Sequence, residues 1–61
     1  MPYVNVKVAG PLTDAQKKEI AAGIAAVLQK AAGKEPKTTY TVFEEIPRNN
    51  WAVGANLLSE G

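Results

Sequence analysis

The second residue of the chain, Pro2, is the one whose chemistry depends most on its position. An initiator methionine followed by a small residue is normally removed, so we expect the mature protein to begin with Pro2 and to carry a free secondary amine. A terminal α-amino group has a reference pKa of about 7.7–8.0, and burial or a nearby cation lowers that pKa toward neutrality. Because a group that titrates near working pH is suited to general acid–base catalysis, Pro2 is the candidate catalytic residue.

A β-strand is predicted to begin directly after Pro2. Valine occupies every second position from Val4 to Val8, and the intervening residues are polar or aromatic, which is the period of two of a half-buried strand. Gly10-Pro11 then interrupts the pattern, as such pairs do. Because strand pairing fixes a chain end that would otherwise fray, this arrangement would hold the Pro2 nitrogen in a defined place.

A long helix is predicted to follow this break. Its start is marked by residues 13–16, a capping box with Thr13 as the N-cap and Gln16 at the third helical position. Gly33 is the expected C-cap. Five apolar residues recur at helical spacing and form one stripe that can cover a sheet: Ile20, Ile24, Val27, Leu28 and Ala31.

The second strand is predicted over residues 38–46, which are rich in β-branched and aromatic side chains, and Pro47 ends it. Two strands joined through a helix of this length form a βαβ unit with parallel strands and a right-handed crossover. Residues 48–58 are expected to form a turn and a short hairpin around Gly54. The predicted fold class is therefore α/β (α+β), with residues 1–61 forming one domain.

The composition limits both the partners of this chain and the ways in which it is stabilised. With 61 residues, no cysteine and no histidine, it lacks disulfides and the usual transition-metal ligands, so self-association is the remaining route to a sufficient core. One helix covers only one face of a two-stranded sheet, which points the same way. A net charge of +1 and the lack of a long apolar run argue against nucleic-acid and membrane partners. We expect a cytoplasmic oligomer without a cofactor.

The order and spacing of these features resemble the tautomerase superfamily, in particular its small 4-oxalocrotonate tautomerase-like members. The matching parts are Pro2, the helix start at residues 13–17, the second strand through residues 44–46, and residues 51–54, an aromatic followed by a glycine-containing turn. Together they cover nearly the whole chain.

The resemblance implies a βαβ subunit that dimerises and assembles as a trimer of dimers, a homohexamer. It also implies that Pro2 is the general base, moving a proton between carbons, or between oxygen and carbon, of an unsaturated keto acid. In such enzymes arginines hold the substrate carboxylate and polarise its carbonyl, and an aromatic residue keeps the pocket apolar. Trp51 falls at the position of that aromatic.

The positions of the family's arginines are not basic here. The arginine near the helix start aligns with Leu12, which would make the pocket mouth apolar, and the one early in the second strand aligns with Tyr40. Tyr40 could donate a hydrogen bond to an enolate oxygen or only pack within its strand. Arg48, the single arginine of the chain, lies in the turn before Trp51. It could bind a substrate carboxylate through its planar fork or be a solvated surface residue.

The leading hypothesis is an isomerase in which Pro2 shuttles a proton on an enol or unsaturated keto acid. Its substrate, a small-molecule carboxylate, would contact Arg48, Trp51, Tyr40 and Leu12. A second hypothesis keeps the fold and the proline but changes the reaction to dehalogenation, hydration or decarboxylation, with the protonated amine as acid. A third is a non-catalytic subunit of a hetero-oligomer whose partner supplies the missing arginines.

Overall fold

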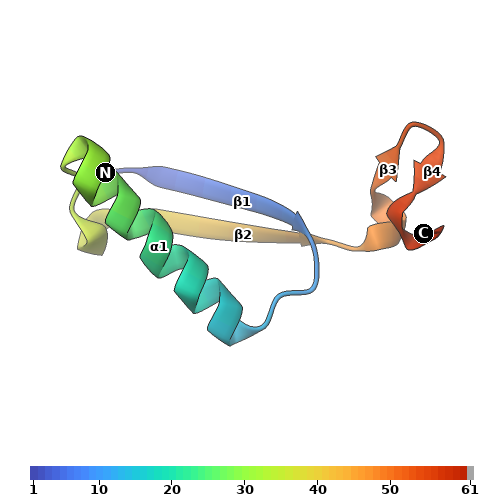
Figure 1. The fold of residues 1–61 in the computed structure, drawn as a ribbon, viewed down its shortest axis with the longest axis horizontal. Coiled ribbons are helices and arrows are strands. Elements are labelled where there is room, and N and C mark those ends of the chain that lie inside the picture. The colour runs from blue at the N-terminus through green and yellow to red at the C-terminus, as the bar shows by residue number, and fades with distance from the viewer. Residues whose placement is uncertain (61) are drawn as a thin grey trace.

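The computed structural model describes residues 1–60, so Gly61, the last residue of the expected domain, lies outside them. The described chain forms the predicted βαβ unit followed by a small hairpin (Figure 1). The elements are, in chain order, β1 (Tyr3–Ala9), α1 (Asp14–Ala32), β2 (Tyr40–Ile46), β3 (Ala52–Val53) and β4 (Asn56–Leu57). Short 3-10 turns lie at Pro36–Thr38, Arg48–Asn50 and Leu58–Glu60.

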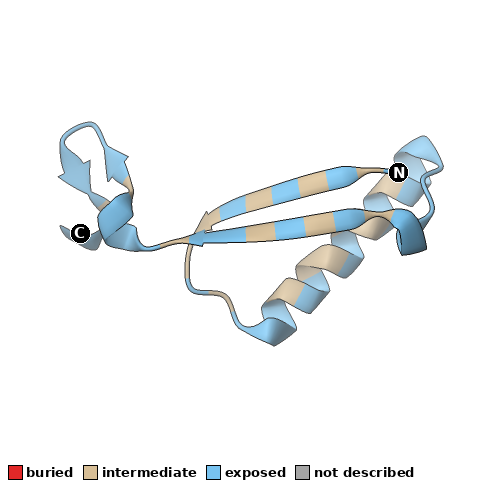
Figure 2. Cartoon of the chain, turned by 180° about the vertical axis from the view of Figure 1, so that it is seen from behind, coloured by how far each residue is buried: buried red, intermediate tan, exposed pale blue. Residues whose placement is uncertain are grey.

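β1 and β2 pair in parallel, from Tyr3 opposite Tyr40 to Ala9 opposite Ile46. Side chains therefore alternate between the face that α1 covers and a face that no element within residues 1–60 covers (Figure 2). β2 begins two residues later than predicted, because residues 36–38 form a 3-10 turn instead of extended backbone. The hydroxyl of Thr39 stabilises this turn by donating to the Glu35 carbonyl at 2.9 Å.

The predicted boundaries of α1 are confirmed by its capping contacts. The Gln16 N–H donates to Thr13 Oγ1 at 3.1 Å, and the Thr13 N–H donates to Gln16 Oε1 at 2.9 Å, which completes the capping box. At the other end Gly33 has φ +66°, a left-handed conformation that favours glycine, and its N–H donates to Gln29 O at 2.9 Å. Of the helices in residues 1–60, none has the length and apolar character needed to span a bilayer.

β3 and β4 pair antiparallel, with Ala52 opposite Leu57, and form the predicted hairpin. Gly54 lies in its turn with φ +62°, which a residue with a Cβ rarely adopts. The hairpin extends from the end of β2 that lies opposite the chain start (Figure 1). Its exposed apolar side chains, Val53 at 66% and Leu57 at 38%, have no core of their own to enter.

The single chain does not close a hydrophobic core, since no residue among 1–60 is buried (Figure 2). The Cα radius of gyration is 14.4 Å, against about 10.5 Å for a compact chain of this length. The accessible surface is 4655 Å², whereas a compact protein of 6.5 kDa exposes about 3,800 Å². The excess of roughly 800 Å² equals what each partner contributes to an interface of standard size. The fold therefore fits self-association.

Candidate active site

Pro2 lies where the strand pair begins, directly before β1. Its carbonyl accepts a hydrogen bond from the Tyr40 N–H at 2.9 Å, so the residue is held by β2 and does not hang free. Pro2 is half-buried. Beside it the side chains of Tyr3 and Tyr40 lie on the uncovered face of the sheet and are 68% and 55% exposed. Of the residues expected at the site, Tyr40 is the one that the single chain places next to Pro2.

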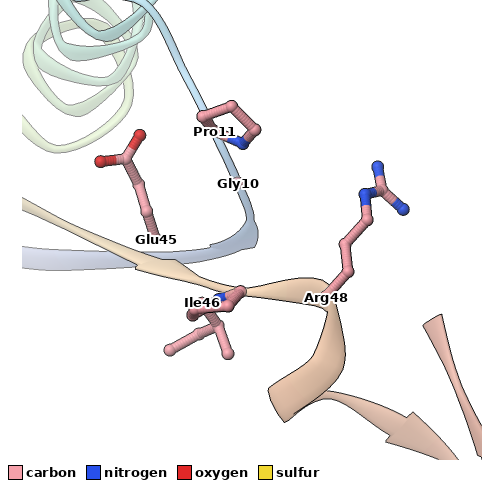
Figure 3. Close-up of a pocket in the computed structure, with 6 residues that line it drawn as sticks. Gly10, Pro11, Glu45, Ile46 and Arg48 are labelled. Atoms are coloured by element: carbon pink, nitrogen blue, oxygen red, sulfur yellow. The ribbon is translucent and has the colours of Figure 1, made fainter. Parts of the chain in front are cut away.

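The opposite end of the strand pair carries a cavity of about 420 Å³, which we call the corner hollow (Figure 3). Its lining residues are Gly10, Pro11, Glu45, Ile46, Pro47 and Arg48. Figure 3 shows the Glu45 and Arg48 side chains extending to the same side as Pro11. Within residues 1–60 of the single chain, the Arg48 guanidinium forms no ion pair, so it is available to an anion.

Glu45 has both carboxylate oxygens engaged in this corner. Oε1 accepts from the Leu12 N–H at 2.7 Å, and Oε2 lies 3.0 Å from Lys17 Nζ. The backbone hydrogen bond from Leu12, followed by the contact with Lys17, lowers the pKa of the Glu45 carboxyl below its ordinary value of 4.5. Leu12 thus contributes its backbone to a polar contact, in addition to the apolar side chain expected from the sequence.

The neighbouring glutamate faces the other way. Glu44 accepts from Asn5 Nδ2 at 2.8 Å on the uncovered face of the sheet, where it is also opposite Lys7 in the register. Adjacent strand residues thus enter different surroundings, because successive side chains of a strand point to opposite faces of the sheet. The partners of Glu45 were not identified from the sequence, although the predicted parallel strands would have put Glu45 on the helix side, within reach of the first turns of α1.

Trp51 is half-buried in a second hollow on the uncovered face, about 280 Å³ in volume. We call it the tryptophan hollow; its lining residues are Lys7, Ile46, Asn50, Trp51 and Ala52. Arg48 and Trp51 are held together by the 3-10 turn, in which the Trp51 N–H donates to the Arg48 carbonyl at 3.3 Å. They nevertheless line two neighbouring hollows, with Ile46 common to both.

The single chain does not bring all the expected site residues together. Pro2 and Tyr40 lie at the start of the strand pair, whereas Leu12, Arg48 and Trp51 lie beyond its end (Figure 1). Strands of seven residues separate the two groups, and such strands span about 20 Å. No cluster of three or more metal-ligating side chains of the His, Cys, Asp or Glu type occurs within residues 1–60. The expected site residues carry a guanidinium, a phenol, an indole and a proline ring.

Solved structures with this fold were found by comparison. YwhB, a homologue of 4-oxalocrotonate tautomerase, is 27% identical with a TM-score of 0.87, and the match covers 98% of each chain. A structure from work on trans-3-chloroacrylic acid dehalogenase activity is 25% identical with a TM-score of 0.79, covering 92% of this chain and 97% of that one. The fold is that of the 4-oxalocrotonate tautomerase homologues.

Sequence comparison gives the family directly. The family model described as Tautomerase enzyme matches residues 2–61. Probable tautomerase K2 of Dickeya dadantii (strain 3937) is 34% identical over 61 residues, which covers 98% of this chain and 91% of that protein. A probable tautomerase of Bacillus cereus is 35% identical over 60 residues, and the match covers 98% of each chain. The chain belongs to the tautomerase enzyme family.

Proposed function

We propose that this protein is a tautomerase in which the amine of Pro2 moves a proton on an enol or unsaturated keto acid. The observation that carries the proposal is the seating of Pro2 at the head of a paired strand, through the 2.9 Å hydrogen bond from Tyr40, in a member of the tautomerase family. The amine exists only after Met1 has been removed, because an amide nitrogen has no basic lone pair.

In the proposed reaction the Pro2 nitrogen takes the enol proton and returns a proton to a carbon of the conjugated chain, so no atom is gained or lost. The substrate carboxylate binds Arg48, whose planar guanidinium can hold both oxygens. The Tyr40 hydroxyl donates to the oxygen on which enolate charge develops. Trp51 and the side chain of Leu12 keep the surroundings apolar, which strengthens these electrostatic contacts.

The site requires more than one copy of the chain. Pro2 and Arg48 are separated by strands of seven residues, about 20 Å of backbone, whereas a small keto acid is less than half as long. The start of one copy must therefore meet the corner hollow of another. Cyclic or dihedral assembly generates such contacts repeatedly, and a homohexamer built as a trimer of dimers is the arrangement we propose. The exposed apolar area of the single chain supports this assembly.

Subunit mixing tests the proposal. At substrate concentrations below KM, we expect the Pro2→Ala protein to be nearly inactive alone in ketonising a 2-hydroxydienoate, and the Arg48→Ala protein to retain at most about a tenth of the wild-type rate. Co-refolded in equal amounts, they should regain about a quarter of the wild-type rate, because random pairing places an intact Pro2 beside an intact Arg48 in that share of sites. Mixing Pro2→Ala with the double variant is the control and should restore nothing. Inactive mixtures that native mass spectrometry shows to be mixed oligomers would contradict the shared site.

The second candidate is dehalogenation of a 3-haloacrylate, favoured by the similarity to the structure from work on trans-3-chloroacrylic acid dehalogenase activity. That reaction would use the protonated amine as an acid, so its rate should fall as pH rises through the pKa of Pro2, whereas a tautomerase that uses Pro2 as base should show a rise. Rate measurements on both substrates across the pH range separate the two functions.

A further inference from the structure

The loop between β1 and α1 is fastened to β2 by the side chain of Glu45. Leu12 lies in this loop, one residue before the N-cap of α1, and its N–H donates to Glu45 Oε1 at 2.7 Å. Lys17, near the start of α1, places its Nζ 3.0 Å from the other oxygen of the same carboxylate. Glu45 thus joins the end of one strand to the loop and to the helix that follows it.

Gly10, at the start of the same loop, leaves the space that this contact needs. Its N–H donates to the Ile46 carbonyl at 3.2 Å, which brings the loop backbone against β2. A Cβ built on Gly10 would lie 3.0 Å from the Glu45 Cβ, so a larger residue would push the glutamate stem aside. The glycine therefore lets the loop lie close enough to β2 for the carboxylate to reach Leu12.

The same loop is a wall of the corner hollow. Gly10 and Pro11 line the hollow together with Arg48, and Pro11 lies on the side to which the Arg48 side chain extends (Figure 3). The space between the loop and the guanidinium therefore depends on where the loop lies. A contact that fixes the loop at Leu12 also fixes the shape of the hollow.

We infer that Glu45 is a positioning residue, which by accepting from the Leu12 N–H holds the loop where a substrate carboxylate can bind Arg48. This inference rests on the proposed function, because it assumes that the substrate binds at Arg48 beside Leu12. The acceptor oxygen is what matters, since Lys17 already neutralises the charge of the carboxylate. Substrate affinity should fall in proportion as the competent position of the loop becomes less populated.

Three variants separate the acceptor oxygen from the charge. Glu45→Met keeps a stem of similar length but offers only a weakly accepting sulfur, whereas Glu45→Gln keeps an oxygen for the Leu12 N–H without the charge. Lys17→Met removes the ion pair and leaves the carboxylate in place.

The test measures KM and kcat for ketonisation of a 2-hydroxydienoate. We expect Glu45→Met to raise KM about three- to tenfold, the size of one hydrogen bond, with little change in kcat. Glu45→Gln and Lys17→Met should stay within about twofold of the wild-type KM, as exposed substitutions usually do. A wild-type KM in Glu45→Met, or a rise as large in either of the other two variants, would overturn the inference.

Two measurements distinguish positioning from a loss of stability. Gly33→Ala is a destabilised control, because Gly33 has φ +66° and lies at the end of α1 away from Leu12, and it should keep the wild-type KM. Amide hydrogen exchange at Leu12, followed by NMR of the ¹⁵N-labelled oligomer, should be faster in Glu45→Met than in Glu45→Gln. Equal exchange rates in these two variants would contradict the inference.

Crotonate binding keeps the inference separate from the proposed reaction. Crotonate is a small unsaturated monocarboxylate, and its affinity is measured by NMR titration of each variant. Weaker binding to Glu45→Met than to Glu45→Gln supports the inference even where no dienoate is turned over. Equal binding to both contradicts it, and turnover of the dienoate with an unchanged KM in Glu45→Met would overturn the positioning role while the proposed function stands.

Discussion

The two ends of the strand pair hold different parts of the chemistry. The start of the pair has Pro2, fixed by one backbone hydrogen bond from Tyr40, and two exposed tyrosine rings. The other end has two hollows, a guanidinium that forms no ion pair within residues 1–60, and a carboxylate with both oxygens bound. In the proposed function the start supplies the base and the far end recognises the substrate. Because about 20 Å of strand separates them, that function requires copies of the chain placed against one another.

Blocking the nitrogen at the start should have the largest effect. Protein that retains Met1 should lose about 10²–10⁴-fold in activity relative to processed protein, the usual contribution of a positioned acid–base group. In the processed protein kcat/KM should rise with pH through the pKa of the amine, near or below its reference value of about 7.7–8.0, because only the neutral amine is a base. Intact mass identifies the two forms.

Pro36→Ala is the control for this prediction, since Pro36 lies in an exposed turn after α1 and carries no terminal amine. Its activity should match that of the wild type. Equal rates for blocked and processed protein would show that the Pro2 nitrogen is not the base. The proposed division between a base at the start of the strand pair and substrate recognition at its far end would then be wrong.

Removing the guanidinium at the far end should have the next largest effect. Arg48→Ala should raise KM with a loss in kcat/KM of about 10–100-fold, the value of about 1.5–3 kcal/mol for hydrogen bonds to a charged group. Arg48→Lys keeps the charge without the planar fork and should recover only part of that loss. An Arg48→Ala protein with unchanged KM would identify Arg48 as a solvated surface residue.

Much of the fold follows from local sequence signals. The capping box of Thr13 and Gln16, the left-handed Gly33 and the alternating valines of β1 each act over a few residues, so the sequence predicts them well. The start of β2 was wrong by two residues, because the hydroxyls of Thr38 and Thr39 bond to the Glu35 carbonyl and keep the chain in a turn. Side chains with strand propensity do not exclude such a turn.

The candidate site was predicted less completely, for two physical reasons. The contact between Glu45 and the Leu12 N–H joins residues 33 apart, and no local pattern signals it. The expected residues lie at two ends of the strand pair, and whether they meet depends on strand length and on how copies assemble. Local sequence patterns identify candidate residues but do not show which of them meet. The roles of Pro2 and Arg48 remain predictions.

Two glycines at opposite ends give a smaller but sharper contrast. Gly33, after α1, and Gly54, in the hairpin, have φ values of +66° and +62°, so alanine at either should cost about 1 kcal/mol of unfolding free energy. Only Gly54→Ala should also lower kcat/KM, because the hairpin adjoins Trp51, whose carbonyl accepts from the Leu58 N–H at 2.9 Å. Thermal unfolding measures the loss of stability in both variants, and steady-state kinetics measure kcat/KM. An equal loss of kcat/KM in Gly33→Ala would contradict a specific role of the hairpin turn in activity.

The smallest expected effect is the acid dependence of stability at the corner. The pKa of Glu45 is lowered in the folded chain, chiefly by the Leu12 N–H, so the ionised carboxylate stabilises the fold at pH above its ordinary pKa of 4.5. That stabilisation is lost as pH falls through the lower pKa of the folded state. Near neutral pH the wild type should therefore have a higher melting temperature than Glu45→Gln. This difference in melting temperature should shrink below pH 4.5. Glu44→Gln should lack this trend, because its acceptor contact with Asn5 faces the other side of the sheet; the same acid trend in both variants would mean that the corner contact is not its source.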